Sequence, residues 1–218
     1  MSAQPLKTSR LVWLGLGLTT ALLVLAFLLA ALNLRAGLGK PLPVISQVAD
    51  FTLTNQNGQA VTLADLRGRV WVGDIIFTRC PGPCLKMTRQ MRELQQSLPS
   101  GSHARLVTLT TDPEFDTPAV LKTYAGRFGA DLNRWCFLTG LKPQIAALGR
   151  DSLKLTAIEK KPEDRQSPDD LFIHSTIFVL VDKKGQVRGV YETTGEGVDP
   201  SQVQKQLLAG LRRLERER

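Results

Sequence analysis

The feature that most restricts how this chain can fold is an uncharged apolar segment near its N-terminus. Arg10 and Arg35 bracket residues 11–34, a stretch of 24 positions without Asp, Glu, Lys or Arg. At about 1.5 Å rise per residue, a helix of this length crosses a hydrocarbon core about 30 Å thick with some tilt. Trp13 lies near one end, where an amphipathic ring suits the membrane interface. We therefore expect a single transmembrane helix over residues 11–34, after a short tail of residues 1–10.

A cleaved secretory signal peptide is the alternative interpretation of this segment. Signal peptides have an apolar core of about 7–15 residues, which is shorter than the segment here, so an uncleaved anchor is favoured. The flanking charges do not decide the orientation, because Lys7 and Arg10 on one side are matched by Arg35 and Lys40 on the other. Only ten residues precede the span, too few for an organelle transit peptide, and a bacterial inner membrane fits best.

Half of the net positive charge of the chain lies around the apolar segment. The net charge is +8, and residues 1–40 contribute four basic residues and no acidic one. The remaining residues hold 24 basic and 20 acidic side chains (28 − 4 and 20 − 0). No basic run is interleaved with aromatic residues, which make up 6% of the chain. We therefore expect no nucleic-acid partner.

The rest of the chain divides into a linker and one domain. Residues 35–47 (RAGLGKPLPVISQ) are rich in Gly and Pro and lack helical periodicity, which is typical of a linker. Residues 48–218 have the length of a single domain. This domain opens with two short alternating runs on either side of Asn57-Gly58, a pattern that predicts a β-hairpin.

Apolar runs then alternate with amphipathic ones. Short β-branched runs predict strands over residues 70–77, 104–111, 135–138 and 176–181, and the last pairs with residues 187–191 through a turn at 182–185. Helical spacing predicts helices over residues 85–98, 117–128, 142–150 and 200–214. The polar stretch 160–170 is expected to be a solvated loop. This order predicts an α/β protein with a thioredoxin-like fold and an N-terminal β-hairpin, preceded by a single transmembrane helix.

Cys80 and Cys84 stand at the junction between the strand at 70–77 and the helix that follows it. At positions i and i+4 of a first helical turn, two side chains share one face, so both sulfurs can form a disulfide or bind one metal ion. The helix N-terminus favours thiolate, and we expect Arg79 and Lys86 to act in the same direction. We predict a redox pair that also ligates metal; two buried structural cysteines are the less favoured alternative.

The two histidines differ in their surroundings. His103 lies in a polar turn and is expected to be solvated. His174 directly precedes the strand at 176–181, in a segment that packs against the Cys-bearing helix start in a thioredoxin-like fold. Two soft thiolates and one imidazole suit Cu(I), whereas structural zinc requires a fourth ligand. Cys80, Cys84 and His174 are therefore the predicted metal ligands, with copper favoured over zinc.

Two other groups of residues receive structural interpretations. Acidic residues gather in Asp112-Pro-Glu-Phe-Asp116, before Thr117-Pro118. We interpret them as turn-forming and capping groups, with Thr117 as the N-cap of the next helix, and not as carboxylate ligands of a metal. Cys136 lies in a short apolar strand, where a free cysteine behaves as a small hydrophobic residue, and it is assigned no role.

Several stretches of the chain together resemble the Sco/SenC family of copper chaperones, over about residues 48–192. The carrying motifs are Phe51-Thr-Leu with Asn57-Gly58 and Leu63-Ala-Asp-Leu-Arg67-Gly68, Phe77-Thr78-Arg79-Cys80-Pro81 with Cys84, Thr111-Asp112-Pro113-Glu114 with Asp116-Thr117-Pro118, Trp135 with Phe137-Leu138-Thr139-Gly140, and His174-Ser175-Thr176. The chain departs from the family at Gly82, where an acidic residue is usual, and at Leu85, where proline is usual.

The resemblance implies copper, as Cu(I) or Cu(II), bound by Cys80, Cys84 and His174. It implies a role in assembling the dicopper centre of cytochrome c oxidase, by delivering copper or by reducing cysteines. The implied partners are the oxidase subunit that carries the dicopper site, copper donors or thiol reductants, and membrane lipid around residues 11–34. The implied location is a bacterial inner membrane, crossed once, with the soluble domain in the periplasm.

Two functions of different classes use the same residues. The first is copper delivery, in which the protein is a metallochaperone and not an enzyme. The second is a membrane-anchored thiol-disulfide oxidoreductase that uses the Cys80/Cys84 pair. His174 discriminates between them, because copper requires it as a ligand and disulfide exchange does not. A peroxiredoxin is less favoured, since its Pro-x-x-x-Thr-x-x-Cys pattern requires Thr where this chain has Phe77.

Overall fold

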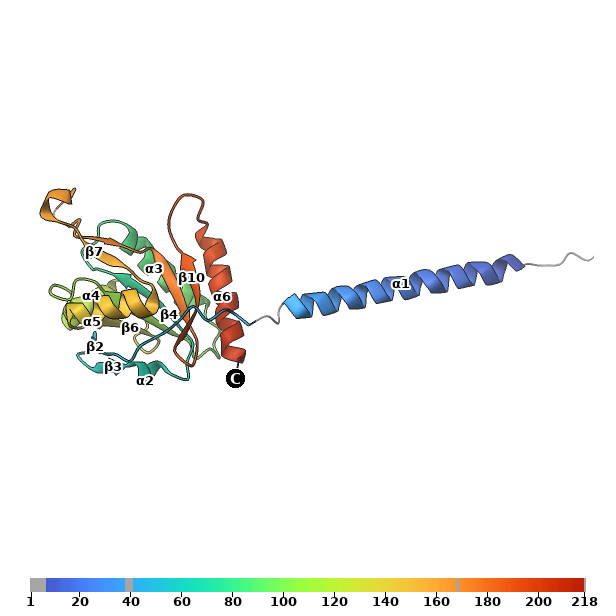
Figure 1. The fold of residues 1–218 in the computed structure, drawn as a ribbon, viewed down its shortest axis with the longest axis horizontal. Helices are drawn as coiled ribbons and strands as arrows, with labels where there is room; N and C mark the ends of the chain where they lie inside the picture. The colour runs from blue at the N-terminus through green and yellow to red at the C-terminus, as the bar shows by residue number, and fades with distance from the viewer. Residues whose placement is uncertain (1–6, 38–40, 168, 218) are drawn as a thin grey trace, which may run out of the picture. The chain divides into compact units, whose positions relative to one another are not determined.

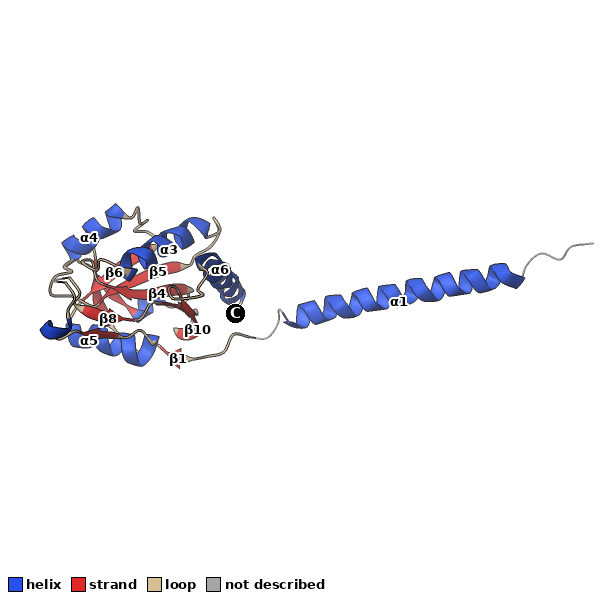
Figure 2. Cartoon of the chain, turned by 90° about the horizontal axis from the view of Figure 1, so that it is seen from above, coloured by secondary structure: helices blue, strands red, loops and turns tan. Residues whose placement is uncertain are grey.

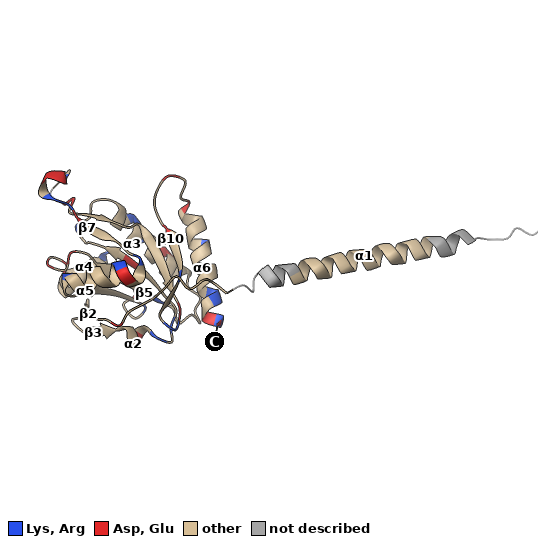
Figure 3. Ribbon diagram, viewed as in Figure 1, with Lys and Arg blue, Asp and Glu red and all other residues tan. Residues whose placement is uncertain are grey.

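The computed structural model describes residues 7–37, 41–167 and 169–217 (Figure 1). These divide into an N-terminal unit that ends at Pro41 and a domain that begins at Leu42. The N-terminal unit contains α1 (Lys7–Gly37). Its residues Val12–Leu32 have a mean hydropathy of 2.4 and none of them is buried, so by length and composition this stretch could cross a membrane. Figure 3 shows no charged position along this part of the helix.

The described residues of the domain form a mixed eight-stranded sheet with the order β1-β10-β9-β4-β5-β6-β2-β3. The three central strands β4, β5 and β6 run parallel, and β9 is antiparallel to β4. The strands are β1 (Ser46–Gln47), β2 (Thr52–Asn55), β3 (Ala60–Thr62), β4 (Trp71–Ile76), β5 (Arg105–Thr110), β6 (Trp135–Thr139), β9 (Ile177–Val181) and β10 (Gln186–Glu192).

Helices cover both faces of this sheet (Figure 2). One face carries α3 (Pro83–Ser97), α4 (Pro118–Arg127) and α6 (Pro200–Arg216), and the other carries α2 (Leu63–Leu66), α5 (Lys142–Ala147) and a π-helical segment, η1 (Leu148–Leu153). Because successive side chains of a strand point to opposite faces, a strand covered on both sides is expected to be mostly apolar. In β4, Val72 and Ile76 pack under the first set of helices, and Trp71 and Ile75 pack under the second.

Most of the predicted elements are present in the structure. The β2–β3 hairpin pairs Leu53 with Val61, and its turn places Gly58 at a φ of +78°, a left-handed conformation that glycine adopts without strain. The helix predicted from residue 117 onward begins as expected, because the Thr117 hydroxyl caps it by accepting the Val120 N–H. The thioredoxin-like α/β architecture with its N-terminal hairpin is thus confirmed.

The segment before His174 contains two strands that were not predicted. The described residues of 160–170 form the expected exposed loop, with a 3-10 turn, η2 (Pro162–Asp164), but this loop connects two short antiparallel strands, β7 (Ala157–Glu159) and β8 (Phe172–His174). An ion pair between Lys160 and Asp170 (2.7 Å) supports the base of this hairpin. His174 therefore lies within a strand of its own, not in a loop before β9. Strands of three residues are too short to show a recognisable period.

The boundaries of the expected linker also shift. Helix α1 continues to Gly37, and residues 38–40 lie outside the described part of the chain. At the other end, Ser46 and Gln47 pair with β10 as strand β1. The Leu42 carbonyl accepts hydrogen bonds from the buried Arg188 guanidinium, which also pairs with Asp182. The last part of residues 35–47 therefore belongs structurally to the domain.

Candidate metal centre

The two cysteines follow the C-terminal end of β4, but only one of them is helical. Helix α3 begins at Pro83, so Cys84 lies in its first turn and Cys80 lies in the preceding loop. The Cys80 N–H donates to the Phe77 carbonyl (3.2 Å) and thereby closes a turn. The expectation that both side chains share a helix face was therefore wrong. The two sulfurs approach each other because the loop turns back over the helix start.

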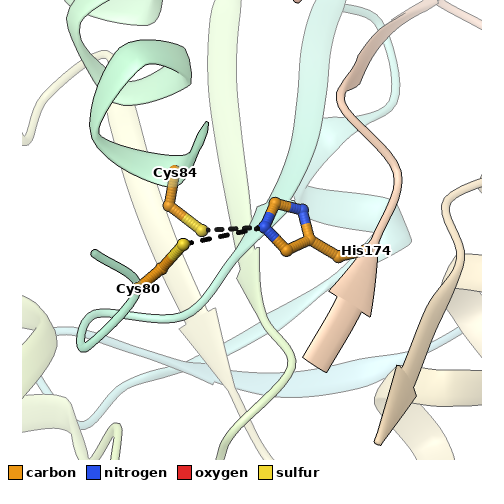
Figure 4. Close-up of side chains that lie close together, drawn as sticks. All are labelled: Cys80, Cys84 and His174. Carbon is orange, nitrogen blue, oxygen red and sulfur yellow. Dashed lines mark hydrogen bonds between the residues drawn. The ribbon is translucent and has the colours of Figure 1, made fainter. Parts of the chain in front are cut away.

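The structure brings the three predicted ligands together (Figure 4). The His174 Nε2 atom lies 3.1 Å from the Cys84 Sγ atom and 3.9 Å from the Cys80 Sγ atom. The ligand atoms of the three residues all lie within 4.8 Å of one another. Both cysteines are buried and His174 is partly buried. The cluster thus joins the start of α3 to a strand that follows it by 90 residues.

Three contacts fix the orientation of the His174 ring. Its backbone is paired with Ala157 in the β7–β8 hairpin. Its Nδ1 atom lies 3.1 Å from the Ser175 carbonyl oxygen, and its ring meets the Phe77 ring edge-on at 5.9 Å between centroids. A proton on Nδ1 can be donated to the Ser175 carbonyl, which leaves the Nε2 lone pair directed at the sulfurs. This is the usual way in which a neighbouring carbonyl orients a metal-binding histidine.

Asp116 holds the loop that carries Cys80. This carboxylate is fully buried, and it accepts hydrogen bonds from the Thr78 N–H (3.1 Å), the Thr78 hydroxyl and the Thr110 hydroxyl. Sequence reasoning assigned the acidic segment to turns and caps and so missed this role. No local pattern could have revealed it, because Thr78 and Asp116 are 38 residues apart. Asp116 ties the residue two positions before Cys80 to the end of β5.

The hollow beside the sulfurs connects the cluster to the surface. It has a volume of about 300 Å³ and lies between the Pro81–Pro83 turn and the β8 strand. Cys80, His174 and Phe172 line it, together with the charged side chains of Lys160 and Asp170. A ligand or a partner segment can therefore reach the cluster, although the cysteine side chains themselves are buried.

Comparison with known proteins assigns the family of this chain. The SCO1/SenC family model matches residues 42–209, which is most of the chain. The chain belongs to the SCO1/SenC family. Among its relatives is a SCO1 protein homolog of Bacillus subtilis, which is 38% identical over 147 residues, or 66% of this chain and 73% of the relative. The resemblance noted in the sequence is thus confirmed.

Solved structures with the same fold belong to this family. BsSco, described as having a disulfide switch and as a member of the Sco family of cytochrome c oxidase assembly proteins, is 33% identical with a TM-score of 0.63, covering 78% of this chain and 96% of its own. ScoI of Bradyrhizobium japonicum, solved with copper bound, has a TM-score of 0.62 at 24% identity, covering 78% and 99% of the two chains. The second likeness supports the fold alone.

The two thiols of this SCO1/SenC protein differ in acidity. A hydrogen bond with Cys84 is the largest contribution to the pKa of Cys80 and lowers it to about 4, against the opposing effect of burial. His174 adds a further hydrogen bond that lowers it. The pKa of Cys84 is raised, first by burial and then by the adjacent Cys80. Without metal, the pair therefore holds one thiolate, at Cys80, and one thiol, at Cys84.

Arg79 does not have the electrostatic role expected for it. Its guanidinium pairs with the Asp112 carboxylate (2.7 Å) and lies over the Phe115 ring, 4.0 Å from the centroid. Neither Arg79 nor Lys86 is among the causes of the lowered pKa of Cys80. The expected help from these two cations is therefore not among the main causes of the acidity of Cys80. The stabilising groups are Cys84, His174 and the backbone N–H groups of the turn.

A buried carboxylate that sequence reasoning overlooked lies in the strand before the site. Asp74 is fully buried in β4, and neither of its oxygens has a hydrogen-bond partner among the described residues. Burial raises the pKa of Asp74 to about 7. Its negative charge raises the pKa of both Cys84 and His174. The signal in the sequence was one acid within the otherwise apolar run VWVGDIIF.

The pKa of His174 results from opposing effects. Burial is the largest single contribution and lowers it. The hydrogen bonds with Cys80 and the Ser175 carbonyl, and the negative charges of Cys80 and Asp74, act in the other direction and together outweigh burial. The net effect raises the pKa of His174. When no metal is bound, the raised pKa favours a positively charged His174 imidazole beside the Cys80 thiolate.

The remaining cysteine and histidine lie outside the cluster. Cys136 is half-buried in β6, its Sγ atom is 3.7 Å from the Leu106 carbonyl oxygen, and burial raises its pKa to about 12. His103 is exposed in the turn before β5, as expected. All three cysteines are free thiols in this structure.

The donor set of the cluster fits copper. Two sulfur atoms and one imidazole nitrogen are ligands that Cu(I) accepts at low coordination number. A tetrahedral structural zinc site requires four ligands, and no fourth Cys, His, Asp or Glu joins the cluster among the described residues. Because the atoms already lie within 4.8 Å of one another, they can enclose one ion without a rearrangement of the fold.

Proposed function

We propose that this chain is a membrane-anchored copper-binding protein that assists assembly of the dicopper centre of cytochrome c oxidase. Cys80, Cys84 and His174 are its proposed copper ligands. The observation that carries the proposal is the convergence of two sulfurs and an imidazole nitrogen within 4.8 Å, beside a surface hollow. The description of BsSco as an oxidase assembly protein supports the same role here.

The protonation states of the site favour binding of Cu(I). Cys80 is already a thiolate at neutral pH, so only the Cys84 proton has to be displaced from the two sulfurs. Metal binding requires deprotonated thiols and a neutral imidazole, and it therefore releases protons. The bound ion is the cargo, which a partner reaches through the hollow. Cu(II) is the second oxidation state proposed for the site.

A second candidate function, thiol-disulfide exchange, is favoured by the asymmetry of the thiols. The Cys80 thiolate can attack a partner disulfide, forming a mixed disulfide and releasing one partner thiolate, which takes up a proton. Cys84 gives up its proton, which the released partner thiolate takes up, and the Cys84 sulfur then attacks the Cys80 sulfur. This forms the Cys80–Cys84 disulfide and releases the second partner sulfur as a thiolate, which water protonates. The partner gains two electrons and the pair loses two. The disulfide switch attributed to BsSco supports this candidate.

We further propose the location and the organisation of the chain. Residues 11–34 span the bacterial inner membrane once after a short tail of residues 1–10, residues 35–41 form the linker, and the domain that begins at Leu42 lies in the periplasm. The apolar stretch of α1 supports the anchor. The proposed partners are the oxidase subunit with the dicopper site, copper donors or thiol reductants, and the lipid around the anchor.

Titration of the full chain with Cu(I) against a competing chelator tests the copper-binding proposal. We expect one Cu(I) per chain, and His174→Ala should weaken binding by at least about 10-fold to 100-fold, since losing an outer-shell group alone commonly has that effect. His103→Ala is the matched control, because it removes the other, exposed histidine, and it should leave the affinity unchanged.

The same variants separate the two candidate functions. Reduction of the Cys80–Cys84 disulfide by a small thiol involves no metal, so His174→Ala should leave its rate largely unaltered. If His174→Ala retains the Cu(I) affinity of the wild type but slows disulfide exchange, the copper-binding proposal fails. His174 is then an acid-base group of an oxidoreductase.

A further inference from the structure

Three arginines gather at the edge of the sheet opposite the metal centre. Because β4, β5 and β6 are parallel, their N-terminal ends share one edge, and the Cys-bearing loop follows β4 at the other edge. Arg69 lies two residues before β4, Arg105 begins β5, and Arg134 directly precedes β6. Neighbouring strands are about 4.8 Å apart, so the three backbone positions lie side by side.

Backbone hydrogen bonds hold these positions together. The Arg105 N–H donates to the Val70 carbonyl (3.0 Å), next to Arg69, and the Leu106 N–H donates to the Arg134 carbonyl (2.8 Å). The arginine pocket formed in this way, lined by Arg69, Arg105 and Arg134, encloses about 260 Å³. Its other lining residues are Ser102, His103, Ala104 and Asn133. None of its lining residues carries a carboxylate.

None of the three guanidinium groups of the arginine pocket forms an ion pair within the described part of the chain. Two carboxylates at the rim hydrogen-bond to residues that line the pocket and offset part of its positive charge. Asp131 accepts the Asn133 N–H (3.0 Å), and Glu215 accepts the Ser102 hydroxyl (2.7 Å) and the His103 N–H (3.2 Å).

The arginines are close enough to influence one another. The pKa of Arg105 is lowered, first by burial and then by the positive charge of Arg69, with Arg134 adding to the effect and the Asp131 charge opposing it. Arg105 and Arg134 are partly buried, whereas Arg69 is exposed. A pocket in which three positive charges gather against two carboxylates at its rim, without an ion pair, is suited to an anionic ligand.

We propose that the arginine pocket binds an oxyanion of the phosphate class, either free phosphate or the phosphate of an anionic lipid headgroup. A guanidinium presents a planar fork of N–H donors that matches two phosphate oxygens, and Arg69, Arg105 and Arg134 supply three such forks. Ser102 and Asn133 border the same hollow, and the Ser102 hydroxyl donates to Glu215.

The length of the linker favours the lipid as the source of the phosphate, and this preference rests on the proposed anchoring of α1. Four residues separate Gly37, the end of α1, from Leu42, where the domain begins. At no more than about 3.6 Å per residue, a connection of this length reaches at most about 18 Å. The domain of an anchored chain thus stays within reach of the bilayer surface. If the arginine pocket holds a headgroup, the bound lipid and the metal centre lie at opposite edges of the sheet.

The first experiment measures binding of inorganic phosphate to the full chain in a nonionic detergent by calorimetry. We expect saturable binding in the wild type. Arg69→Gln and Arg134→Gln together should weaken it by at least about 10-fold, because each change removes a charge-assisted hydrogen-bonding fork. The triple variant that adds Arg105→Gln should show no measurable binding.

The matched control carries Arg89→Gln, Arg92→Gln and Arg127→Gln on α3 and α4. It removes the same number of charges from exposed positions and should bind phosphate like the wild type. Cu(I) titration of every variant shows whether the fold and the remote metal centre persist, and it reports independently on the proposed copper function. The double variant keeps the partly buried Arg105 in case the triple variant does not fold.

The second experiment distinguishes the two sources. The full chain is placed in nanodiscs of phosphatidylcholine alone or with phosphatidylglycerol, and hydrogen exchange of residues 102–106 and 131–135 is measured. Slower exchange with phosphatidylglycerol, abolished in the arginine variants but not in the control, identifies the lipid source. Phosphate binding without this protection identifies free phosphate. Absence of both effects in the wild type, or their persistence in the triple variant, overturns the proposal.

Discussion

Replacing Asp74 with asparagine tests the electrostatics behind the metal centre. The carboxylate is fully buried and unpartnered among the described residues, and its pKa rises from the ordinary 3.8 to about 7 because of burial. Between these two values, the folded state holds a proton that the unfolded state has lost. Stability is therefore fully present below about pH 4 and decreases as the pH rises to about 7. Over about three pH units at about 1.4 kcal/mol each, the decrease is about 4 kcal/mol.

Asp74→Asn should remove this pH-dependent loss, because an amide of nearly the same shape does not ionise. The free energy of unfolding of the variant, relative to the wild type, should rise by up to about 4 kcal/mol between pH 4 and pH 8. Urea unfolding of the reduced, copper-free chain, followed by tryptophan fluorescence, measures this difference, since Trp71 and Trp135 are fully buried in the domain.

Asp50→Asn provides the matched control for this experiment. Asp50 has an exposed side chain, so its replacement should leave the pH profile of stability parallel to that of the wild type. Titrations of groups that Asp74 does not influence are common to the three proteins and cancel in the differences, whereas Cys84 and His174, whose pKa values the Asp74 charge raises, also contribute to the Asp74→Asn difference. If the Asp74→Asn profile also runs parallel to that of the wild type from pH 4 to pH 8, the inference that Asp74 ionises at a cost inside the fold is wrong.

Three further outcomes are expected. The rate of Cys80 alkylation in the reduced, copper-free chain, measured by mass spectrometry, should rise with pH around a midpoint near pH 4. Cys84→Ala should move that midpoint upward, because it removes the largest contribution that lowers the pKa of Cys80. An unmoved midpoint would contradict this cause. Asp116→Ala should lower the unfolding free energy by about 3 kcal/mol or more and weaken Cu(I) binding, since it leaves the buried Thr110 hydroxyl and the partly buried donors of Thr78 unpaired. Thermal unfolding and copper titration measure the two effects, and an unchanged melting temperature would refute the role. A reporter fused after Arg218 that functions only after export should be active, whereas activity of a cytoplasmic reporter at the same position would reject the proposed topology.

The sequence was most informative where structure depends on near neighbours along the chain. The uncharged stretch predicted α1, because length and composition alone decide whether a helix can cross a bilayer. Apolar runs with turn residues between them predicted the central strands, and Thr117-Pro118 predicted the start of α4. The residue types of Cys80, Cys84 and His174 were enough to nominate a soft-metal site, because ligand chemistry resides in the side chains themselves.

Tertiary structure decided the arrangement of those residues. The helix start at Pro83 left Cys80 in the loop, so the sulfurs meet through a turn and not through helix periodicity. The direction of Arg79 depends on Asp112, 33 residues away. The contact between Cys84 and His174 spans 90 residues. The pKa of each thiol depends on these distant neighbours and on burial. The amino-acid sequence shows neither the neighbours nor the burial, because packing of the sheet and helices brings together segments that are far apart in the chain.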